Sequence, residues 1–193
     1  MVVVIRARHG KETGVMGSDK NVVYSGRFYD FVVENGWEYL RPSGFDDVVV
    51  IVPVTNSGML VLVEQYRVPA ERKVIELPAG LVGDLDEYGG ENIVETARRE
   101  LVEETGYSAD RFEIVADSPP SAGSNTLSVK MVLATGLEKT GPGGGVKGES
   151  IQVHEIPARE GTERLARFRD EGFAVDLKIY AGLWFARNVI STS

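Results

Sequence analysis

The chain of 193 residues has no cysteine, and its only histidines are His9 and His154. Without cysteine there is no disulfide bond, no thiol nucleophile and no thiolate ligand for zinc. Two imidazole groups give little support to a Ser-His-Asp hydrolase, and the sequence contains no G-x-S-x-G motif. These absences argue against thiol enzymes, zinc enzymes and serine hydrolases.

Positive charge is also scarce, with 21 Lys and Arg residues against 29 Asp and Glu residues and a net charge of -8. The summed field of such a chain repels nucleic acid and anionic membranes, and no cluster of basic residues offsets it. No stretch approaches the roughly 18 apolar residues of a membrane helix, and the start "MVVVI" is too short for a signal peptide. We therefore expect neither nucleic acid nor membrane as a partner, and a cytoplasmic location.

The patterns that are present predict a chain of strands and helices. Residues 1–45 alternate short β-like runs with turns marked by glycine, which predicts an N-terminal arm or small sheet. The runs "DDVVVIVPV" (46–54) and "MLVLVEQYR" (59–67) flank the turn "TNSG" and predict a hairpin whose strands are buried on both faces. We expect this hairpin to form the central sheet.

The second half of the chain carries one strong helix pattern. Residues 91–105 place apolar side chains on one face at helical spacing, and Gly106 ends the pattern. Further strands are predicted at 111–117, 126–135 and 150–156, and amphipathic helices at 161–172 and 176–188. The loop "GLEKTGPGGGVKGE" (136–149) is so rich in glycine that we expect it to have little capacity to hold one conformation.

The stretch "RELVEETGY" (99–107) gathers three carboxylates near the C-terminal end of the predicted helix. Glu100, Glu103 and Glu104 fall in one arc that borders the apolar stripe. Their mutual repulsion and their place at the negative end of the helix dipole both destabilise the helix. A hard divalent cation removes both penalties, because carboxylate oxygens on one face are suitable ligands for Mg²⁺ or Mn²⁺. From this pattern alone, a solvated acidic face paired with neighbouring arginines is the simpler interpretation.

The wider stretch resembles the signature of the Nudix family of nucleoside diphosphate hydrolases. That signature is Gly, five residues, Glu, seven residues, then Arg-Glu-apolar-x-Glu-Glu-x-Gly-apolar, and Glu91 with "RELVEETGY" matches it position by position. The signature glycine resembles Gly80 of "LPAG", although ten residues rather than five separate it from Glu91. We interpret "GDLDEYGG" (83–90) as containing a five-residue insertion in the loop before the helix. By resemblance, Glu91 and Arg99 form an ion pair that braces the loop and the helix.

The segments "EQYRVP", "IELPAG", "SPPSAGSNTLSV" and "GESIQVHEI" occur in an order that resembles the ADP-ribose pyrophosphatase branch of the family. The resemblance implies that Glu100 and Glu104 are the principal metal ligands. It adds the carbonyl oxygen of Ala79 as a further ligand and places Glu103 close to the cluster. The implied cofactor is Mg²⁺, with Mn²⁺ as the alternative.

The same resemblance assigns the contacts with substrate. Trp37 of "WEYLR" resembles an aromatic residue that stacks on adenine, with Arg41 as the accompanying arginine. Arg67 of "EQYR" resembles an arginine that contacts the diphosphate or the terminal ribose, and Gly123 of "SPPSAGSN" falls at a substrate-binding position.

Hydrolysis also requires a general base, which in this branch is often a glutamate on a mobile loop. Glu149, at the end of "TGPGGGVKGE", resembles that residue, and the glycines would let the segment close over bound substrate. A linker that ends in glutamate by chance is an equally good interpretation. Glu103 is a second candidate for the base, and Glu155 is a weaker one because it falls within the following strand.

The resemblance also implies a fold, an assembly and an activity. The expected fold is α/β, a three-layer α/β/α sandwich with a mixed central β-sheet. We expect residues 1–45 to be an N-terminal β arm that serves dimerisation and residues 46–193 to be the Nudix domain, in a homodimer whose arms complete each other's substrate sites. The expected activity is Mg²⁺-dependent hydrolysis of the pyrophosphate bond of a nucleoside diphosphate sugar, with ADP-ribose giving AMP and ribose 5-phosphate. GDP-mannose or another nucleotide sugar is the alternative substrate, and a non-catalytic sensor of nucleotide sugars is the alternative function.

Overall fold

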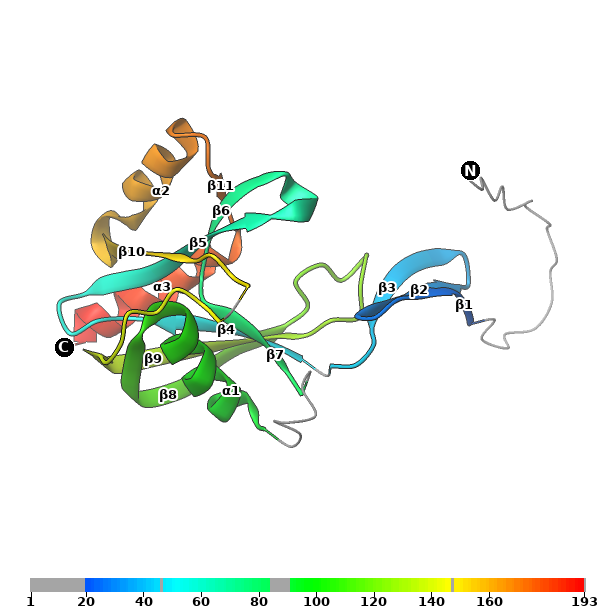
Figure 1. Cartoon of the computed structure of the whole chain (residues 1–193), viewed down its shortest axis with the longest axis horizontal. Coiled ribbons are helices and arrows are strands. Elements are labelled where there is room, and N and C mark those ends of the chain that lie inside the picture. Colours follow the sequence, from blue (N-terminus) through cyan, green and yellow to red (C-terminus); the bar gives the residue numbers. More distant parts are fainter. Residues whose placement is uncertain (1–19, 46, 84–90, 147, 193) are drawn as a thin grey trace.

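The structure of the protein is a computed structural model, which describes residues 20–45, 47–83, 91–146 and 148–192 (Figure 1). Within those ranges, no helix is both long enough and apolar enough to cross a membrane. The predicted insertion lies outside the described residues except for Gly83, and so do residues 1–19 with His9. The described chain consists of a small N-terminal sheet and a larger domain that holds two further sheets.

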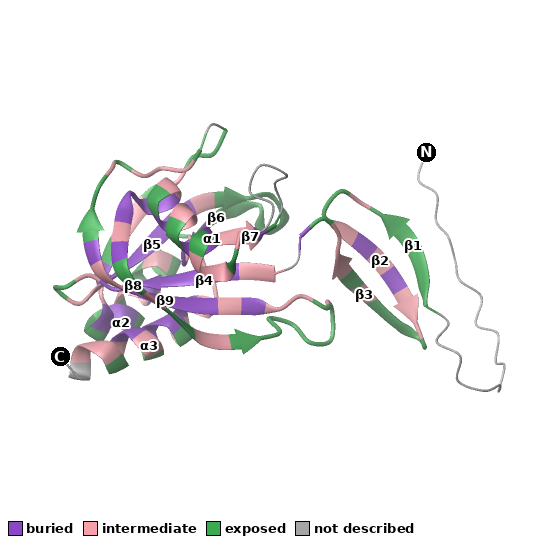
Figure 2. Cartoon of the chain, turned by 90° about the horizontal axis from the view of Figure 1, so that it is seen from below, coloured by how far each residue is buried: buried purple, intermediate pink, exposed green. Residues whose placement is uncertain are grey.

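The N-terminal sheet is antiparallel and has three strands, β1 (Asn21–Ser25), β2 (Tyr29–Glu34) and β3 (Trp37–Pro42). Asn35 and Gly36 join β2 to β3 with φ values of 50° and 81°. Positive φ at both positions is what a two-residue type I′ hairpin turn requires. In both views this sheet extends away from the larger domain (Figures 1 and 2). The short strands predicted in this region are therefore present from residue 21 onward.

The larger domain contains two mixed sheets of four strands. The first has the order β7 (Ala79–Val82), β4 (Asp47–Pro53), β9 (Val129–Lys139) and β8 (Tyr107–Ser118). The second has the order β10 (Gln152–Pro157), β5 (Met59–Arg67), β6 (Arg72–Glu76) and β11 (Ala174–Val175). One pair in each sheet is parallel, β4 with β9 and β6 with β11. The central β layer is mixed, as predicted, but two sheets build it.

The prediction that residues 46–54 and 59–67 form a paired hairpin is wrong. Both segments are strands, and a turn joins them in which the N–H of Thr55 donates to the carbonyl oxygen of Met59 over 2.9 Å. Beyond an isolated bridge between Val54 and Leu60, however, β4 and β5 belong to different sheets. Two apolar runs around a turn indicate strands that are neighbours in the chain, but not the partners with which each strand pairs.

Helices cover both faces of the β layer. The helical elements are η1 (Val68–Ala70), α1 (Ile93–Glu100), η3 (Leu101–Thr105), η4 (Ala158–Glu160), α2 (Gly161–Asp170) and α3 (Lys178–Thr192). On β4, Val49 and Ile51 join the core around α1, whereas Val50 and Val52 join the core around α2 and α3. All four are fully buried, which explains why the strand is a continuous apolar run. The predicted α/β/α sandwich is confirmed (Figures 1 and 2).

The other predicted elements lie close to their expected bounds. The predicted strands correspond to β8, β9 and β10, and the two predicted amphipathic helices correspond to α2 and α3. Strand β8 begins earlier than predicted, at Tyr107, directly after the glycine that ends the acidic helix.

The acidic helix predicted at 91–105 is two elements. The first, α1, begins with a capping box, in which the side chain of Asn92 accepts from the backbone N–H of Glu95 and the side chain of Glu95 accepts from that of Asn92. A π-helical turn, η3, continues the helix as far as Gly106, whose φ is 71°. Single π turns are frequent at functional sites, and this one carries two of the three clustered glutamates.

Candidate active site

A cavity of about 370 Å³ lies between the two sheets, at the end of β4 remote from the turn that leads to β5. Its lining residues are Val48, Gln65, Arg67, Ala79, Gly80, Leu81, Glu100, Glu104 and Glu149. Three of these residues are glutamates and one is an arginine. The fold therefore brings together three groups that the sequence predicted separately, namely the acidic helix, the arginine of "EQYR" and the loop glutamate.

Two residues of "LPAG" shape the acidic end of this cavity. The N–H of Ala79 donates to Oε2 of Glu104 over 3.2 Å, and Glu104 is only 5% exposed. Gly80 lies against Glu100, where an added β carbon would come within 2.4 Å of Cδ of that glutamate. Any side chain at Gly80 would displace the Glu100 carboxylate, which gives a physical reason for glycine at this position.

Arg99 forms ion pairs with three glutamates around the helix. Its Nη1 atom lies 2.9 Å from Oε1 of Glu100 and 3.0 Å from Oε2 of Glu103. Its Nη2 atom lies 3.3 Å from Oε2 of Glu91, so the predicted bracing ion pair is confirmed. Glu103 is thus held by an arginine and, unlike Glu100 and Glu104, is not among the residues that line the cavity. Its roles as metal ligand and as base stay predictions.

The buried carboxyl groups of the cavity have raised pKa values. Burial raises the pKa of Glu100 to about 7. Burial raises the pKa of Glu104 to about 8, with a further contribution from the negative charge of Glu100. The charge of Glu149 raises both pKa values, whereas Arg67 lowers the pKa of Glu104. Without a cation, the cavity is therefore lined by two buried acids, Glu100 and Glu104, whose pKa values lie near or above neutral pH.

For the metal-free protein, we expect the melting temperature in EDTA to fall as the pH rises from about 5 to 8. Glu100 and Glu104 each have an ordinary pKa of 4.5, but pKa values of about 7 and about 8 in the folded protein. Their contribution to folding stability is complete below pH 4.5 and is lost as the pH rises through 7 and 8. Scanning fluorimetry across this range measures the effect.

The matched control for this pH dependence is the double variant in which Glu100 and Glu104 are both glutamine. In the wild type we expect the melting temperature to differ by on the order of 10 °C between the two ends of this pH range. Because neither amide titrates, this difference should be absent from the double variant. A double variant that keeps the wild-type pH dependence would show that other groups cause it.

The donor set around the cavity fits a hard divalent cation. Carboxylate and carbonyl oxygens are ligands for Mg²⁺ and Mn²⁺, and a cation would cancel the repulsion between Glu100 and Glu104. In the part of the chain that the structure describes, no three acidic or histidine side chains already stand in coordination geometry. Glu100 lines the cavity but also contacts Arg99, so a cation at Glu100 would have to compete with this ion pair. The carbonyl oxygen of Ala79 stays a predicted ligand.

The loop that carries Glu149 is anchored to the end of the acidic helix. The N–H of Gly144 donates to the carbonyl oxygen of Glu104 over 2.9 Å, and the N–H of Gly145 donates to that of Glu103 over 3.0 Å. These bonds satisfy carbonyl groups that the end of a helix leaves without partners. The position of Glu149 is therefore linked to the position of the acidic helix.

Close backbone contact explains the glycines of this loop. Gly143 has a φ of 68°, and an added β carbon would lie 2.4 Å from the carbonyl carbon of Thr105. At the far end of the loop, Oε2 of Glu149 accepts a hydrogen bond from the N–H of Val146 over 3.0 Å. The glycines at 143–145 allow close contact with the helix end. The expectation that this segment has little capacity to hold one conformation stays a prediction.

Glu155, the weakest candidate for the base, lies away from the acidic cluster. Its carboxylate accepts a hydrogen bond from the hydroxyl of Tyr107. Burial, together with this hydrogen bond, raises the pKa of Tyr107 to about 12. Glu155 lines a different cavity beside α2, together with His154, whose Nε2 lies 2.8 Å from Oε2 of Glu64. The structure therefore does not support Glu155 as the base.

Two of the predicted substrate contacts, Trp37 and Gly123, line a cavity of about 410 Å³ between β3 and the loop at 122–126. Trp37 is 64% exposed. Among the described residues, this cavity shares no lining residue with the carboxylate cavity that contains Arg67. Within one chain, the predicted adenine contact and the predicted diphosphate contact are therefore separate.

Arg41 does not line the cavity of Trp37. Its Nη2 atom lies 2.6 Å from Oδ2 of Asp30, which is its direct partner across β2 and β3. The hydrogen bond from Arg41 lowers the pKa of Asp30. Arg41 therefore has a structural contact within the N-terminal sheet, and its role in substrate binding stays a prediction.

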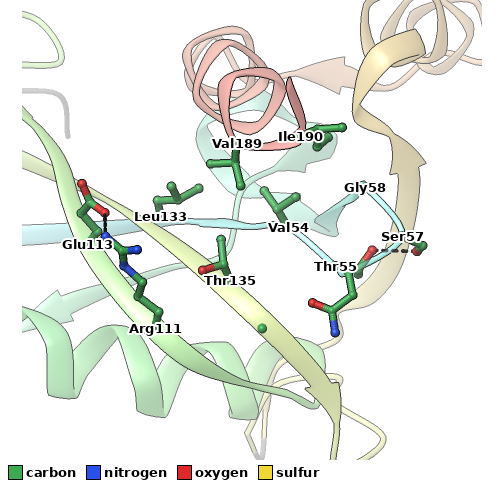
Figure 3. A pocket seen from close by; sticks show the side chains of 12 residues that line it. Val54, Thr55, Ser57, Gly58, Arg111, Glu113, Leu133, Thr135, Val189 and Ile190 are labelled. Atoms are coloured by element: carbon green, nitrogen blue, oxygen red, sulfur yellow. Dashed lines mark hydrogen bonds and ion pairs between the residues drawn. The ribbon is translucent and has the colours of Figure 1, made fainter. Parts of the chain in front are cut away.

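A larger cavity, of about 690 Å³, lies elsewhere (Figure 3). It is formed by the turn at 55–58, by β8 and β9 and by the end of α3. Its one lining carboxylate, Glu113, accepts from Nη2 of Arg111 over 2.7 Å. A cavity with a single, paired carboxylate lacks the acidic cluster that would hold a cation, so size does not identify the candidate active site.

Sequence reasoning missed Gln65, which lines the carboxylate cavity beside Arg67. The two residues alternate along β5 and share one face, whereas Tyr66 between them lies on the opposite face and is 60% exposed. The alternation at the end of this apolar run was a signal that could have identified Gln65. No local pattern could have shown that Gly80 makes room for Glu100, because that contact joins distant parts of the chain.

Comparisons with known proteins bear on the family and the fold of the chain. Residues 44–168 match the sequence model of the NUDIX domain. An ADP-ribose pyrophosphatase of Bacillus subtilis is 34% identical over 129 residues, which cover 61% of this chain and 64% of the relative. A methanol dehydrogenase activator of Bacillus methanolicus is 32% identical over 122 residues, or 63% of each chain. A GDP-mannose pyrophosphatase of Pectobacterium atrosepticum is 30% identical over 154 residues, which cover 74% of this chain and 76% of the relative.

A solved structure described as an ADP compounds hydrolase has the same fold. It superposes with a TM-score of 0.70 over 94% of this chain and 98% of that chain. The sequence identity is 20%, so this likeness concerns the fold alone. The chain spans just under two thirds of the length of the two Bacillus relatives, 63% and 64%. Their activities therefore bear on this chain as hypotheses.

Proposed function

The chain belongs to the Nudix family, and on that premise we propose that it hydrolyses the pyrophosphate bond of a nucleoside diphosphate sugar with Mg²⁺ as cofactor. ADP-ribose is the proposed substrate, and AMP and ribose 5-phosphate are the products. The observation that carries the proposal is the cavity lined by Glu100, Glu104, Glu149 and Arg67. A diphosphate is recognised by cations that carboxylates hold and by a guanidinium group, and this cavity has the carboxylates and the guanidinium group for both kinds of contact.

The four charged residues that line the cavity each have a role in this proposal. Bound Mg²⁺, or Mn²⁺ in its place, would neutralise charge on the phosphoryl oxygens and favour ionisation of the attacking water. Glu100 and Glu104 would hold the cation, and Arg67 would orient the diphosphate with its planar fork of N–H donors. Glu149 would accept the proton of the attacking water or orient that water. Glu103 is the alternative base, but its ion pair with an arginine would first have to open.

A panel of nucleotide sugars tests the proposal. The protein is incubated with Mg²⁺ and either ADP-ribose, GDP-mannose or UDP-glucose, and phosphate is measured after addition of a phosphatase. The phosphatase acts on AMP and sugar phosphates but not on the intact diphosphate, so phosphate reports cleavage of the pyrophosphate bond. We expect the highest release from ADP-ribose and almost none from Glu104→Gln. Tight binding of a nucleotide sugar with no release from any substrate would indicate a sensor instead.

GDP-mannose is the second candidate substrate. The supporting observation is the relative named GDP-mannose pyrophosphatase, which aligns over 74% of this chain. Stacking on an aromatic side chain such as Trp37 tolerates every base, so it does not distinguish adenine from guanine. A higher kcat/KM for GDP-mannose than for ADP-ribose in the same panel would reverse the assignment.

We also propose that the protein acts as a homodimer, with residues 1–45 as the joining arm and residues 46–193 as the Nudix domain. One support is the separation of Trp37 from Arg67 within a single chain. A second is the exposed apolar surface of the arm, which includes Val22, Val23, Tyr24, Phe28 and Leu40. Grouped apolar residues of this kind mark interaction surfaces. An arm from a second copy would bring Trp37 to the diphosphate cavity.

Mixing two impaired variants should restore activity if each site is shared between two copies. Trp37→Ala removes the stacking ring and Glu104→Gln removes a metal ligand, but a dimer with one of each retains one complete site. After subunit exchange, ADP-ribose hydrolysis below the wild-type KM should recover to about a quarter of the wild-type rate, because half of the dimers are mixed. A monomer by light scattering at micromolar concentration, or no gain on mixing, would contradict the shared site.

A further inference from the structure

We infer that Glu76 is a positioning residue that holds the guanidinium group of Arg67 in place for the diphosphate of the substrate, an inference that rests on the function proposed above. Nε of Arg67 lies 2.7 Å from Oε2 of Glu76. The Glu76 side chain is 13% exposed, whereas that of Arg67 is 45% exposed. Arg67 lines the carboxylate cavity and Glu76 does not, so Glu76 would act through the arginine.

The pairing of β5 with β6 shows why Arg67 needs such a partner. Arg67 lies directly opposite Arg72, whereas Glu76 lies opposite Val63, further back along β5. Like charges in opposite positions on two strands repel. Arg72 turns toward the end of the hairpin, where its Nε lies 3.4 Å from the carbonyl oxygen of Ala70. Arg67 turns the other way, so the ion pair with Glu76 fixes the direction of a long side chain at the end of a strand.

Glu76 also keeps Arg67 from pairing with the carboxylates that would bind the cation. Glu100, Glu104 and Glu149 line the same cavity as Arg67. A guanidinium group that is free to move would pair with these carboxylates and oppose cation binding. The contact with Glu76 uses Nε and not the terminal nitrogens, which form the fork that binds phosphate oxygens. Glu76 therefore favours the arrangement in which Arg67 does not pair with these carboxylates, so that the arginine can bind the diphosphate and the carboxylates can bind the cation.

The segment after Glu76 links this arginine to the acidic cluster. Strand β6 ends at Glu76, and the carbonyl oxygen of Pro78 then accepts a hydrogen bond from β4 over 2.8 Å. The next residue, Ala79, donates its N–H to Glu104. The chain thus runs directly from the residue that holds Arg67 to the residue that holds Glu104. A short segment with its own hydrogen bonds sets the spacing between the guanidinium group and a proposed metal ligand.

The kinetic test compares Glu76→Gln, Arg67→Ala and the double variant in hydrolysis of ADP-ribose with Mg²⁺. We expect Glu76→Gln to raise KM about tenfold and to change kcat less than about threefold, because it weakens the placement of a group that binds the substrate. In the Arg67→Ala background, Glu76→Gln should leave KM unchanged, since its effect passes through Arg67. An unchanged KM in the wild-type background, or equal effects in both backgrounds, would overturn the inference.

A matched control comes from a second ion pair of the same kind. Arg111 and Glu113 on β8 also lie 2.7 Å apart, and they line the large cavity of Figure 3 rather than the carboxylate cavity. Glu113→Gln removes one carboxylate from an arginine as Glu76→Gln does. Glu113→Gln should leave KM and kcat at their wild-type values. A tenfold rise in KM would show that the loss of any such ion pair raises KM, whether or not it involves Arg67.

A measurement without catalysis separates this inference from the proposed function. The Nε–H resonance of Arg67, assigned by its loss in Arg67→Lys, should exchange with water at least about tenfold faster in Glu76→Gln than in the wild type. Glu113→Gln should leave that rate unchanged. Equal exchange in the wild type and Glu76→Gln would overturn the inference, whereas an inactive wild type would overturn the proposed function. If Glu76→Gln fails to fold, Glu76→Asp, which keeps the charge but shortens the reach, serves the same comparison.

Discussion

Replacing Glu104 by glutamine should lower the turnover of ADP-ribose by about three orders of magnitude while leaving the fold intact. Glutamine has nearly the same shape, and its carbonyl oxygen can still accept the hydrogen bond that Ala79 donates to Glu104. What the substitution removes is the negative charge that would hold a cation under the proposed function. Glu100→Gln should have the same effect. Steady-state hydrolysis at saturating Mg²⁺ measures the loss, and circular dichroism checks the fold.

The stability of these variants provides the control. In EDTA, Glu100→Gln and Glu104→Gln should melt at a higher temperature than the wild type, because each replaces a buried, mutually repelling acid with a neutral amide. Glu163→Gln, on an exposed position of α2, should change neither activity nor melting temperature. Opposite effects on activity and stability distinguish a lost metal ligand from a damaged fold. If both variants keep wild-type turnover at saturating Mg²⁺, the assignment of the metal ligands is wrong.

Glu149→Gln should lower kcat at least about 100-fold with little change in KM. A general base, or a group that orients the attacking water, gains its value in the transition state, so substrate binding should survive its loss. Glu149 lines the cavity with Glu100 and Glu104, although it lies far from both in sequence. Steady-state kinetics with ADP-ribose separate the two parameters. An unchanged kcat would return Glu149 to the role of a linker residue and make Glu103 the leading candidate for the base.

The anchoring of the loop allows a second test of Glu149. Gly143→Ala should reproduce part of the loss in kcat, because its β carbon would lie 2.4 Å from the backbone of Thr105 and push the loop from the helix end. Gly141→Ala is the matched control in the same loop, since a β carbon there would meet nothing within 4 Å. Equal kcat values for these two variants would show that the position of the loop does not limit the reaction.

The elements of the fold could be predicted where the cause lies in neighbouring residues. The buried run of β4, the apolar stripe of α1 and the Asn-Gly turn at Asn35 each leave a pattern within a few residues. The partners of the strands could not be predicted in this way. Strand β4 pairs with β7 and β9 rather than with β5, and this choice depends on contacts between distant segments.

The same distinction applies to the candidate site. Helical spacing predicted that Glu100 and Glu104 lie on one side of the helix, and the resemblance to the Nudix signature selected them as candidate metal ligands. The contact of Gly80 with Glu100, the anchoring of the loop at Gly143 and the separation of Trp37 from the diphosphate cavity depend on the packed structure. The cytoplasmic location and the absence of a nucleic-acid partner stay predictions.

The parallel pairing of β4 with β9 has a consequence for the order in which the protein folds. Val48 pairs with Val129, and the acidic helix lies in the segment between them. Such a pairing must close a long loop, which makes it slow compared with the formation of local hairpins and helices. We expect the glutamates to be buried beside the sheet only once this loop has closed, so the proposed cation site would be completed late. A bound cation should therefore stabilise the native state but not the folding transition state, and it should slow unfolding without accelerating refolding.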